Sequence, residues 1–301
     1  MLPAAMQAGQ PLRVDGAVSA RLLDALPSIE ALFAAWGLPR VPVSARRRRR
    51  PPWRRPRRGT ACFFSGGVDS FYSVLTKRAE LTQLIFVHGF DVPLDSELRV
   101  SASRAAREAA AAIGLELIEV ETDLRRLIDR YVSWELCHGA ALASVALQFQ
   151  ERFRRVLIPS THSYAHLIPW GSHPLLDPLW STELTEFVHD GTHATRVEKC
   201  LALADSDIAL RHLRVCWENR DGRYNCGECE KCLRTMLSLT AAGALDRCAT
   251  LPHRLDADAV AAMPLSGSNE KGYAEENLAA LEAAGVRPDL QDALRTAISL
   301  S

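Results

Sequence analysis

A glycine pair between a short apolar run and a helical segment is the feature that most constrains this chain. Residues 60–64 read TACFF, which fits a buried strand, residues 65–70 read SGGVDS, and residues 70–79 have helical character. Glycine has no side chain to obstruct a phosphate and reaches backbone angles closed to other residues, so the amides beside Gly66 and Gly67 can point at one anion. The amino end of the helix favours the same anion. These residues predict a phosphate-binding loop.

Three polar side chains of this loop add to the prediction. The hydroxyls of Ser65 and Ser70 can donate hydrogen bonds to a phosphate, and Asp69 lies near the positive end of the helix dipole, where a carboxylate is favoured. The carboxylate of Asp69 can also orient a magnesium ion or the loop amides. The loop lacks the GKS or GKT ending of a Walker A motif, which disfavours an ordinary P-loop ATPase. The plainer interpretation is a Gly-Gly turn with a Ser/Asp cap.

After this loop, apolar runs alternate with helical segments. The further segments with strand character are 84–88, 115–120 and 155–158. The segments with helical character are 98–113, which ends at Gly114 as a helix ends at a C-cap, 124–131 and 140–154. This alternation predicts an α/β fold with a doubly wound parallel sheet, in which ligands bind at the carboxyl ends of the strands.

Four of the eight cysteines lie close together in a polar stretch. They are Cys216, Cys226, Cys229 and Cys232. Four thiolates at this spacing can complete a tetrahedral shell around zinc, and Gly227 permits a tight turn between two of them. An iron–sulfur cluster is the main alternative, because Cys-x2-Cys-x2-Cys is also a ferredoxin-like spacing. The other cysteines are scattered, as expected of small buried hydrophobic residues.

The two motifs together carry a resemblance to a known family. SGGVDS resembles the phosphate loop of the PP-loop (N-type ATP pyrophosphatase) superfamily, which has a HUP-like fold. A PP-loop about 150 residues ahead of such a cysteine cluster is similar to cyano-deazaguanine synthase, the nitrile-forming enzyme of the queuosine pathway. The resemblance covers residues 60–239. It implies that ATP is cleaved between its α- and β-phosphates, that AMP is attached to a substrate oxygen, and that a nucleophile then displaces the AMP.

The resemblance also implies roles for individual residues. The loop residues would hold the pyrophosphate part of ATP with Mg²⁺: Ser65, Gly66, Gly67, Val68, Asp69 and Ser70. At the end of the next strand, Phe86 and His88 would lie beside the adenine. The family places a Lys-x-Glu helix before the first cysteine. Here Arg196 and Lys199 stand in that segment, as catalytic cations, and the four cysteines would hold a structural zinc.

The segment after the strand at 155–158 departs from this family. The family has a Tyr-Pro-Asp-Cys stretch in its substrate loop, whereas residues 162–181 read HSYAHLIPWGSHPLLDPLWS, so the deazaguanine substrate is not carried over. The segment follows a strand and should therefore lie at the ligand-binding edge. Its candidate substrate-binding residues are His162, His166, Trp170, His173 and Asp177. For any one of them taken singly we favour ordinary packing or hydrogen bonding, and it is as a group that they are the best candidates for substrate specificity.

Composition divides the chain into four parts. We expect an N-terminal extension at 1–45, an Arg/Pro-rich linker at 46–58, an ATP pyrophosphatase domain at 59–250 with its zinc site at 216–232, and a helical C-terminal segment at 251–301. Within the extension, an approximately helical pattern at 18–36 is interrupted by Pro27. The run Arg46–Arg58 has two interpretations: an exposed linker, which we favour, or a basic arm for RNA.

The sequence therefore predicts a cytoplasmic, AMP-forming ligase or synthase that uses ATP, Mg²⁺ and Zn²⁺, and a homo-oligomer. It would activate a carboxylate or carbonyl oxygen of a small molecule for attack by ammonia, an amine or a sulfur donor. The alternatives are an RNA-modifying enzyme such as a tRNA thiolase, and a non-catalytic zinc-binding interaction module. A formal net charge of zero gives no global field toward nucleic acid or a membrane. No apolar run approaches the ~20 residues of a membrane-spanning helix, and no signal peptide is recognisable.

Overall fold

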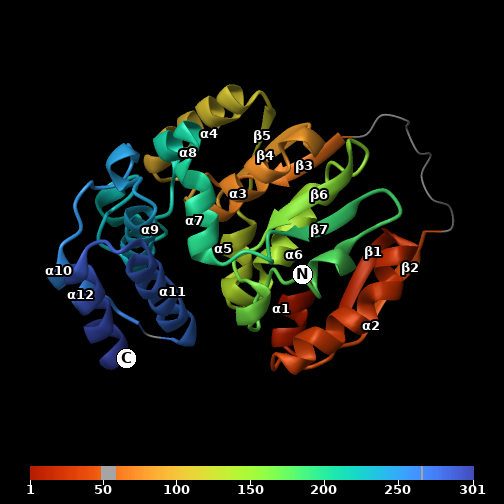
Figure 1. Ribbon diagram of the computed structural model, residues 1–301. Helices are drawn as coiled ribbons and strands as arrows, with labels where there is room; N and C mark the ends of the chain where they lie inside the picture. The colour runs from red at the N-terminus through yellow and green to blue at the C-terminus, as the bar shows by residue number, and fades with distance from the viewer. Residues whose placement is uncertain (49–58, 266) are drawn as a thin grey trace.

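The computed structural model describes residues 1–48, 59–265 and 267–301 and is built around one parallel sheet (Figure 1). Its five strands are β3 (Gly59–Phe63), β4 (Gln83–His88), β5 (Glu116–Glu121), β6 (Phe153–Pro159) and β7 (Glu186–Asp190), in the spatial order β5-β4-β3-β6-β7. All four neighbouring pairs are parallel, which confirms the predicted α/β fold with a parallel sheet. The sequence did not lead us to expect β7, because only two of its five residues are apolar.

Helices cover both faces of this sheet, because successive strand residues point to opposite sides. Cys62 and Phe64 share a buried cluster with α3 (Val68–Thr76), α4 (Leu98–Ile113) and α7 (Arg196–Ala204). Ala61 and Phe63 lie in a second buried cluster with α5 (Leu124–Ile128) and α6 (Trp134–Leu147). The predicted helix at 98–113 is found with the same bounds, and Gly114 closes it in the left-handed conformation, with φ 76°.

The order in which the chain adds strands to the sheet reverses beside β3. It runs from β3 through β4 to β5 on one side, and then returns to β6 and β7 on the other. In open α/β sheets, a crevice forms outside the carboxyl ends of the two strands at such a switch point. The loop that follows β3 and the segment that follows β6 meet here, and they are the two segments in which the sequence places candidate ligand-binding residues.

The N-terminal region is a small parallel βαβ unit (red in Figure 1). It comprises α1 (Leu2–Gln7), β1 (Leu12–Val18), α2 (Ala20–Ala35) and β2 (Val43–Arg47). The expected interruption at Pro27 is wrong, since α2 runs through it, and the burial of Ile29 and Phe33 against the sheet's second cluster outweighs the lost backbone hydrogen bond. The start of the predicted linker, Arg46–Arg47, belongs to β2, and residues 49–58 lie outside the described part of the chain.

The C-terminal region is helical (teal to blue in Figure 1). Its helices are α8 (Asp207–His212), α9 (Glu230–Ala241), α10 (Ala257–Ala261), α11 (Ser268–Ala284) and α12 (Pro288–Ser299). The last two confirm the predicted helical segment, and Gly285 separates them. Helix α11 packs on α7, α9 and α12. Short 3-10 turns lie at Arg78–Glu80, Tyr164–His166, Asp177–Trp180, Arg220–Gly222 and Leu245–Arg247. No helix in the described ranges is long and apolar enough to cross a membrane.

Candidate functional site

The glycine pair forms a tight loop between β3 and α3, as the sequence predicts. Gly66 has φ 76°, a conformation that favours glycine. Its carbonyl accepts a hydrogen bond from the amide of Arg214, at 2.8 Å. The exposed hydroxyl of Ser65 accepts from the amide of Gly67 at 3.3 Å, so its own proton remains to donate. The buried hydroxyl of Ser70 instead donates to the carbonyl of Gly67, at 3.0 Å, and is used within the loop.

Asp69, in the first turn of α3, pairs with two cations from α7. Its Oδ2 accepts from Nη2 of Arg196 at 2.9 Å, and its Oδ1 accepts from Nζ of Lys199 at 3.1 Å. The ammonium group of Lys199 also donates to the carbonyl oxygen of Ser160, just after β6, at 2.6 Å. Both cations are buried. The structure therefore brings Asp69, Arg196 and Lys199 together between the ends of β3 and β6, although they are about 130 residues apart in sequence.

A capping box fixes the helix that carries these cations. The hydroxyl of Thr195 accepts from the amide of Glu198, and the carboxylate of Glu198 accepts from the amide of Thr195. Two donors at the start of α7 are thereby satisfied within the helix. Arg196 and Lys199 lie one turn apart on the helix and both reach Asp69. The local sequence TRVEK thus sets the direction of both side chains.

Burial and charge act in opposite directions on the ionisation of this cluster. Burial favours neutral Asp69, but the charges and hydrogen bonds of Arg196 and Lys199 outweigh it and leave the pKa of Asp69 below its ordinary value. Burial is the largest influence on Lys199 and lowers its pKa, although Asp69 acts to raise it. For Arg196, the nearby Asp69 more than offsets burial, and the pKa is raised. Asp69 is therefore a carboxylate at neutral pH and holds two cations in place.

Further cations surround the loop, and the sequence analysis did not identify them. Arg214 is buried beside Gly66 and donates from Nη2 to Oδ1 of Asn219 at 2.6 Å. Arg234 is buried in α9, with its guanidinium carbon 4.1 Å from the ring centroid of Tyr273 and its Nε 3.4 Å from Oε1 of Glu230. The sequence could have indicated both arginines, because Arg214 lies two residues before Cys216 and Arg234 lies two residues after Cys232.

The two residues expected beside the adenine, Phe86 and His88, are both buried by neighbouring side chains. Phe86 lies in the sheet's first buried cluster, and the ring of His88 contacts it edge-on at 4.7 Å. Nε2 of His88 is 2.8 Å from Oε2 of Glu119, and this oxygen also accepts a hydrogen bond from Ser103. The other carboxylate oxygen of Glu119, Oε1, accepts from Arg107, and both donors belong to α4. His88 thus lies at the carboxyl end of β4, as predicted. Its Nδ1 has no hydrogen-bond partner among the described residues.

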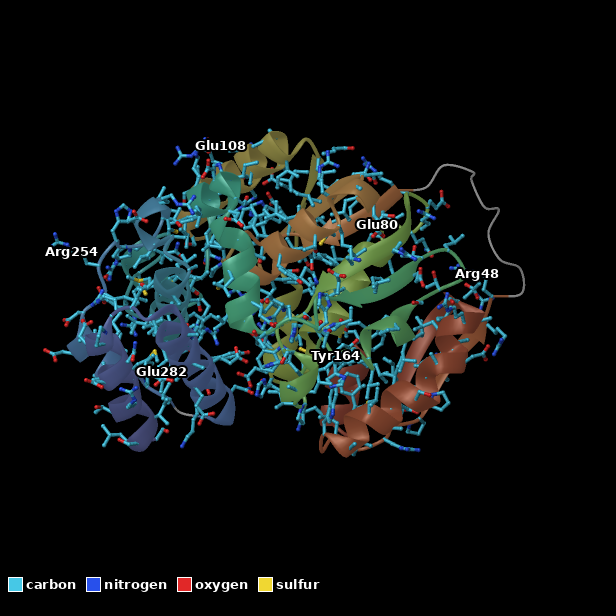
Figure 2. The ribbon with its side chains drawn as sticks, viewed as in Figure 1. Arg48, Glu80, Glu108, Tyr164, Arg254 and Glu282 are labelled. Atoms are coloured by element: carbon cyan, nitrogen blue, oxygen red, sulfur yellow. The ribbon has the colours of Figure 1, made fainter. Side chains whose placement is uncertain are left out.

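The segment after β6 divides into two groups. His162 is buried, with Nδ1 3.2 Å from the hydroxyl of Tyr273 on α11, and its ring contacts Trp170 edge-on at 5.2 Å. His166 is half-exposed, and its Nδ1 lies 3.4 Å from Oε1 of Glu276, one turn along α11 from Tyr273. Figure 2 shows Tyr164 of the same 3-10 turn, which is 65% exposed. This group faces the C-terminal helices, beside Arg196 and Arg234.

The remaining two candidate residues, His173 and Asp177, have other partners. The ring of His173 contacts Trp36 of the N-terminal unit at 5.5 Å. Asp177 is fully buried, and its Oδ2 is 2.7 Å from Nδ1 of His189 and 2.6 Å from the hydroxyl of Ser172. These contacts fix the segment between the sheet and the N-terminal unit, so we assign His173 and Asp177 to packing and to anchoring the loop.

The four clustered cysteines lie together and are buried. Their sulfur atoms all lie within 4.8 Å of one another, with Cys226–Cys232 at 3.8 Å and Cys216–Cys229 at 3.9 Å. Four sulfurs bound at about 2.3 Å to one tetrahedral ion are about 3.8 Å apart, so they could hold a metal ion such as zinc. A cubane iron–sulfur cluster places its four cysteines on four different irons and spaces them more widely. The geometry therefore favours a single ion.

Two residues fix the segments that carry these cysteines. Gly227 has φ 79°, and a Cβ there would lie 2.6 Å from Cγ of Pro252, so only glycine fits the turn. Oδ1 of Asn225 accepts from the amides of Val215 and Cys216, and its Nδ2 donates to the carbonyls of Leu213 and Thr250. The segment held by Asn225 is the one whose Arg214 amide binds Gly66, so the cysteine centre is connected to the glycine loop.

The fold and these two sites define the class to which the chain can be assigned: an α/β protein with a five-stranded parallel sheet and a four-cysteine centre that could bind a metal ion. Comparisons with family models, with curated proteins and with solved structures found no match. The PP-loop resemblance therefore stays a prediction based on the motifs SGGVDS and Cys-x9-Cys-x2-Cys-x2-Cys.

Proposed function

We propose that this protein is an AMP-forming enzyme that activates a carboxylate or carbonyl oxygen of a small molecule with ATP. The observation that carries the proposal is the pairing of Asp69 with Arg196 and Lys199 beside the glycine loop, at the switch point of the sheet. A glycine loop, a helix amino end and buried cations at one strand edge form an anion site suited to the phosphates of a nucleotide.

The reaction would use this site for the leaving group. The acceptor oxygen attacks the α-phosphorus of ATP, the bond from that phosphorus to the bridging oxygen breaks, and pyrophosphate leaves with the electron pair. Ammonia, an amine or a sulfur donor then attacks the activated carbon and releases AMP. Ser65, Arg196 and Lys199 would neutralise the charge that grows on pyrophosphate, because preorganised donors stabilise charge most strongly where water is excluded.

The residues around the glycine loop suggest where Mg²⁺ would bind. Asp69 already faces two cations, so its role in this proposal is to orient them. Asp190, at the end of β7, is buried, its charge acts on Lys199, and its Oδ2 has no hydrogen-bond partner within the described ranges. Oxygen ligands suit Mg²⁺, which makes Asp190 a better candidate ligand than Asp69. For the four-cysteine centre we propose a structural zinc, because no fifth ligand is needed to complete the tetrahedron.

The proposal is tested by the products of ATP turnover. With a mixture of small metabolites as acceptors, we expect the wild-type protein to release AMP and pyrophosphate and to catalyse ATP–pyrophosphate exchange. Asp69→Asn should abolish pyrophosphate release, because Arg196 and Lys199 lose the group that orients them, while metal analysis still finds one ion per chain. Turnover to ADP and phosphate would disprove the proposal.

Two further variants keep this test decisive. Removing Asp69 leaves two buried cations unpaired and can destabilise the chain, so Ser65→Ala serves as a milder change. It deletes one exposed hydroxyl donor, and we expect exchange to fall about tenfold or more without loss of folding, as for other single donors to a developing anion. The matched control is Asp289→Asn, an aspartate in the first turn of α12 that pairs with Arg287, which should exchange at the wild-type rate.

A further inference from the structure

Three nitrogen donors close to the Asp69 cluster have no acceptor. They are Nε2 of His162, Nε1 of Trp170 and Nε of Arg196, each shielded from solvent and without a hydrogen-bond partner among the described residues. His162 and Arg196 are more than nine-tenths buried. Burying a donor without an acceptor costs about 1–3 kcal/mol, so three such donors in one region point to a ligand that supplies acceptors.

Contacts place these donors around one helix. The ring of His162 contacts Trp170, its Nδ1 faces the hydroxyl of Tyr273, and the guanidinium of Arg196 lies 5.9 Å from the Tyr273 ring. Tyr273 belongs to α11, which lies outside the residues 60–239 that carry the family resemblance. Helix α11 therefore completes a region that the motifs alone do not define.

The hydroxyl of Tyr273 sets the tautomer of His162. Burial raises the pKa of Tyr273 and lowers that of His162 to about 4, so at neutral pH the first is a phenol and the second a neutral imidazole. A phenol donates well, and Nδ1 of His162 is the acceptor it faces. The imidazole proton then resides on Nε2, which becomes a donor directed at the ligand.

The surrounding charge favours an anion. Arg196, Arg234 and Lys199 act electrostatically on His162, and Lys231 lies near Arg196 and Asp69. The opposing carboxyl groups are Asp69, Glu230 and Glu276, and burial raises the pKa of Glu230 and Glu276, which favours their neutral forms. An oxygen-rich anion would accept from all three unpartnered donors and would be balanced by these cations. A neutral primary amide has one acceptor oxygen and two N–H donors. The three unpartnered nitrogens are donors themselves and cannot accept hydrogen bonds from the amide.

We infer that His162, Trp170 and Arg196 form the acceptor subsite, that it receives a carboxylate, and that Tyr273 of α11 is a positioning residue for His162. The inference rests on the proposed function, because it places the activated oxygen beside the nucleotide loop. The 3-10 turn Tyr164–His166 lies against α11, where Nδ1 of His166 is 3.4 Å from Oε1 of Glu276, and Tyr164 is 65% exposed, so this turn is the segment that we expect to move aside to admit the ligand.

The experiment observes Trp170 directly. The indole nitrogens of the six tryptophans are labelled with nitrogen-15, the Trp170 resonance is assigned with Trp170→Phe, and the full-length protein is titrated with benzoate and acetate. The matched probes are benzamide and acetamide. We expect a saturable shift of the Trp170 signal with at least one carboxylate, and at least fivefold weaker binding of the corresponding amide. Trp217, 58% exposed in the cysteine segment, is the internal control and should not move.

Variants separate positioning from packing. Tyr273→Phe keeps the ring on which Arg234 stacks but removes the hydroxyl, and we expect it to weaken carboxylate binding at least fivefold while unfolding at the wild-type temperature within a few degrees. His162→Gln should weaken it similarly. No Trp170 shift with either carboxylate, or equal binding of acid and amide, would overturn the subsite. Unchanged affinity in Tyr273→Phe would overturn the positioning role. Neither result bears on ATP–pyrophosphate exchange, which tests the proposed function separately.

Discussion

Single residues in this protein are held by charges that come from distant parts of the chain. Asp69 is a carboxylate because α7 brings Arg196 and Lys199 to it, and His162 is neutral because it is buried near the same cations. Neither ionisation state follows from the neighbours of these residues in sequence. These ionisation states can therefore be tested directly by measuring how stability depends on pH.

The first residue-scale prediction concerns the pH dependence of stability. The pKa of His162 is lowered from an ordinary 6.5 to about 4, by burial first and then by Arg196. Between these values the unfolded chain binds a proton that the folded chain does not, so stability falls as the pH drops from 7 toward 4. Relative to His162→Gln, the wild type should lose about 2 kcal/mol of unfolding free energy between pH 7 and 4.5.

Urea unfolding of both proteins at the two pH values measures this difference. Other groups titrate in the same range, among them Glu276, whose pKa is raised by burial, so only the difference between wild type and His162→Gln is informative. A difference that does not change with pH would mean that His162 is protonated in the folded protein, and the donor role assigned to its Nε2 would then lose its basis.

At the scale of elements, the cysteine segment supports the glycine loop. Arg214 donates its amide to Gly66, and Asn225 ties the residues on either side of Arg214 to Cys216 and Thr250. Helix α9 begins at Glu230, directly after its N-cap Cys229, and carries Arg234 against the ring of Tyr273. An ion held by the four cysteines would thus fix both the segment that contacts the loop and the helix that approaches the acceptor region.

Metal removal tests this connection. We expect Cys229→Ser to lose the bound ion, to lower the unfolding temperature, and to weaken binding of inorganic pyrophosphate several-fold, because Arg214 is no longer held against Gly66. Metal analysis and calorimetric titration with pyrophosphate measure these effects. Cys248→Ser is the matched control: Cys248 is equally buried but outside the cluster, so the ion and the affinity should be retained. Unchanged pyrophosphate affinity in metal-free Cys229→Ser would contradict the connection.

At the scale of the whole molecule, the N-terminal unit and the sheet share one core. Ile29 and Phe33 of α2 lie in the same buried cluster as Phe63 of β3 and Phe187 of β7, and Phe33 also contacts Trp180 at 6.4 Å. Residues 1–45 therefore have no separate core of their own within the described structure. They pack against α6 and the 3-10 turn Asp177–Trp180, on the side of the sheet opposite to α3 and α7.

This shared core predicts a single cooperative unfolding transition. Phe33 is fully buried, so Phe33→Ala should cost about 3–5 kcal/mol and lower the unfolding temperature of the whole chain. Scanning calorimetry with the metal-loaded protein measures it. Val100→Ala, on a residue that is 74% exposed in α4, should change the stability by less than about 0.5 kcal/mol. A separate low-temperature transition in Phe33→Ala would show that the N-terminal unit unfolds by itself.

The sequence by itself determined the local features of this protein. Apolar runs and glycine positions predicted β3, β4, β5 and β6, the helix that ends at Gly114, the glycine loop and the four clustered cysteines, because each depends on residues near one another in the chain. It missed β7, whose five residues are mostly polar, and it wrongly interrupted α2 at Pro27, where burial against the sheet outweighs the local preference.

The tertiary structure alone decided which distant residues meet. It brought His162 and Trp170 of the segment after β6 into contact with each other, placed His173 against Trp36 of the N-terminal unit, and paired Asp177 with His189 of β7. It also added Arg214, Arg234 and Tyr273 to the site. These assignments depend on how α7, α9 and α11 pack against the sheet. Such packing depends on contacts between buried surfaces that are far apart in sequence. Periodicity and motif spacing describe only residues that are near one another, so they do not predict these contacts.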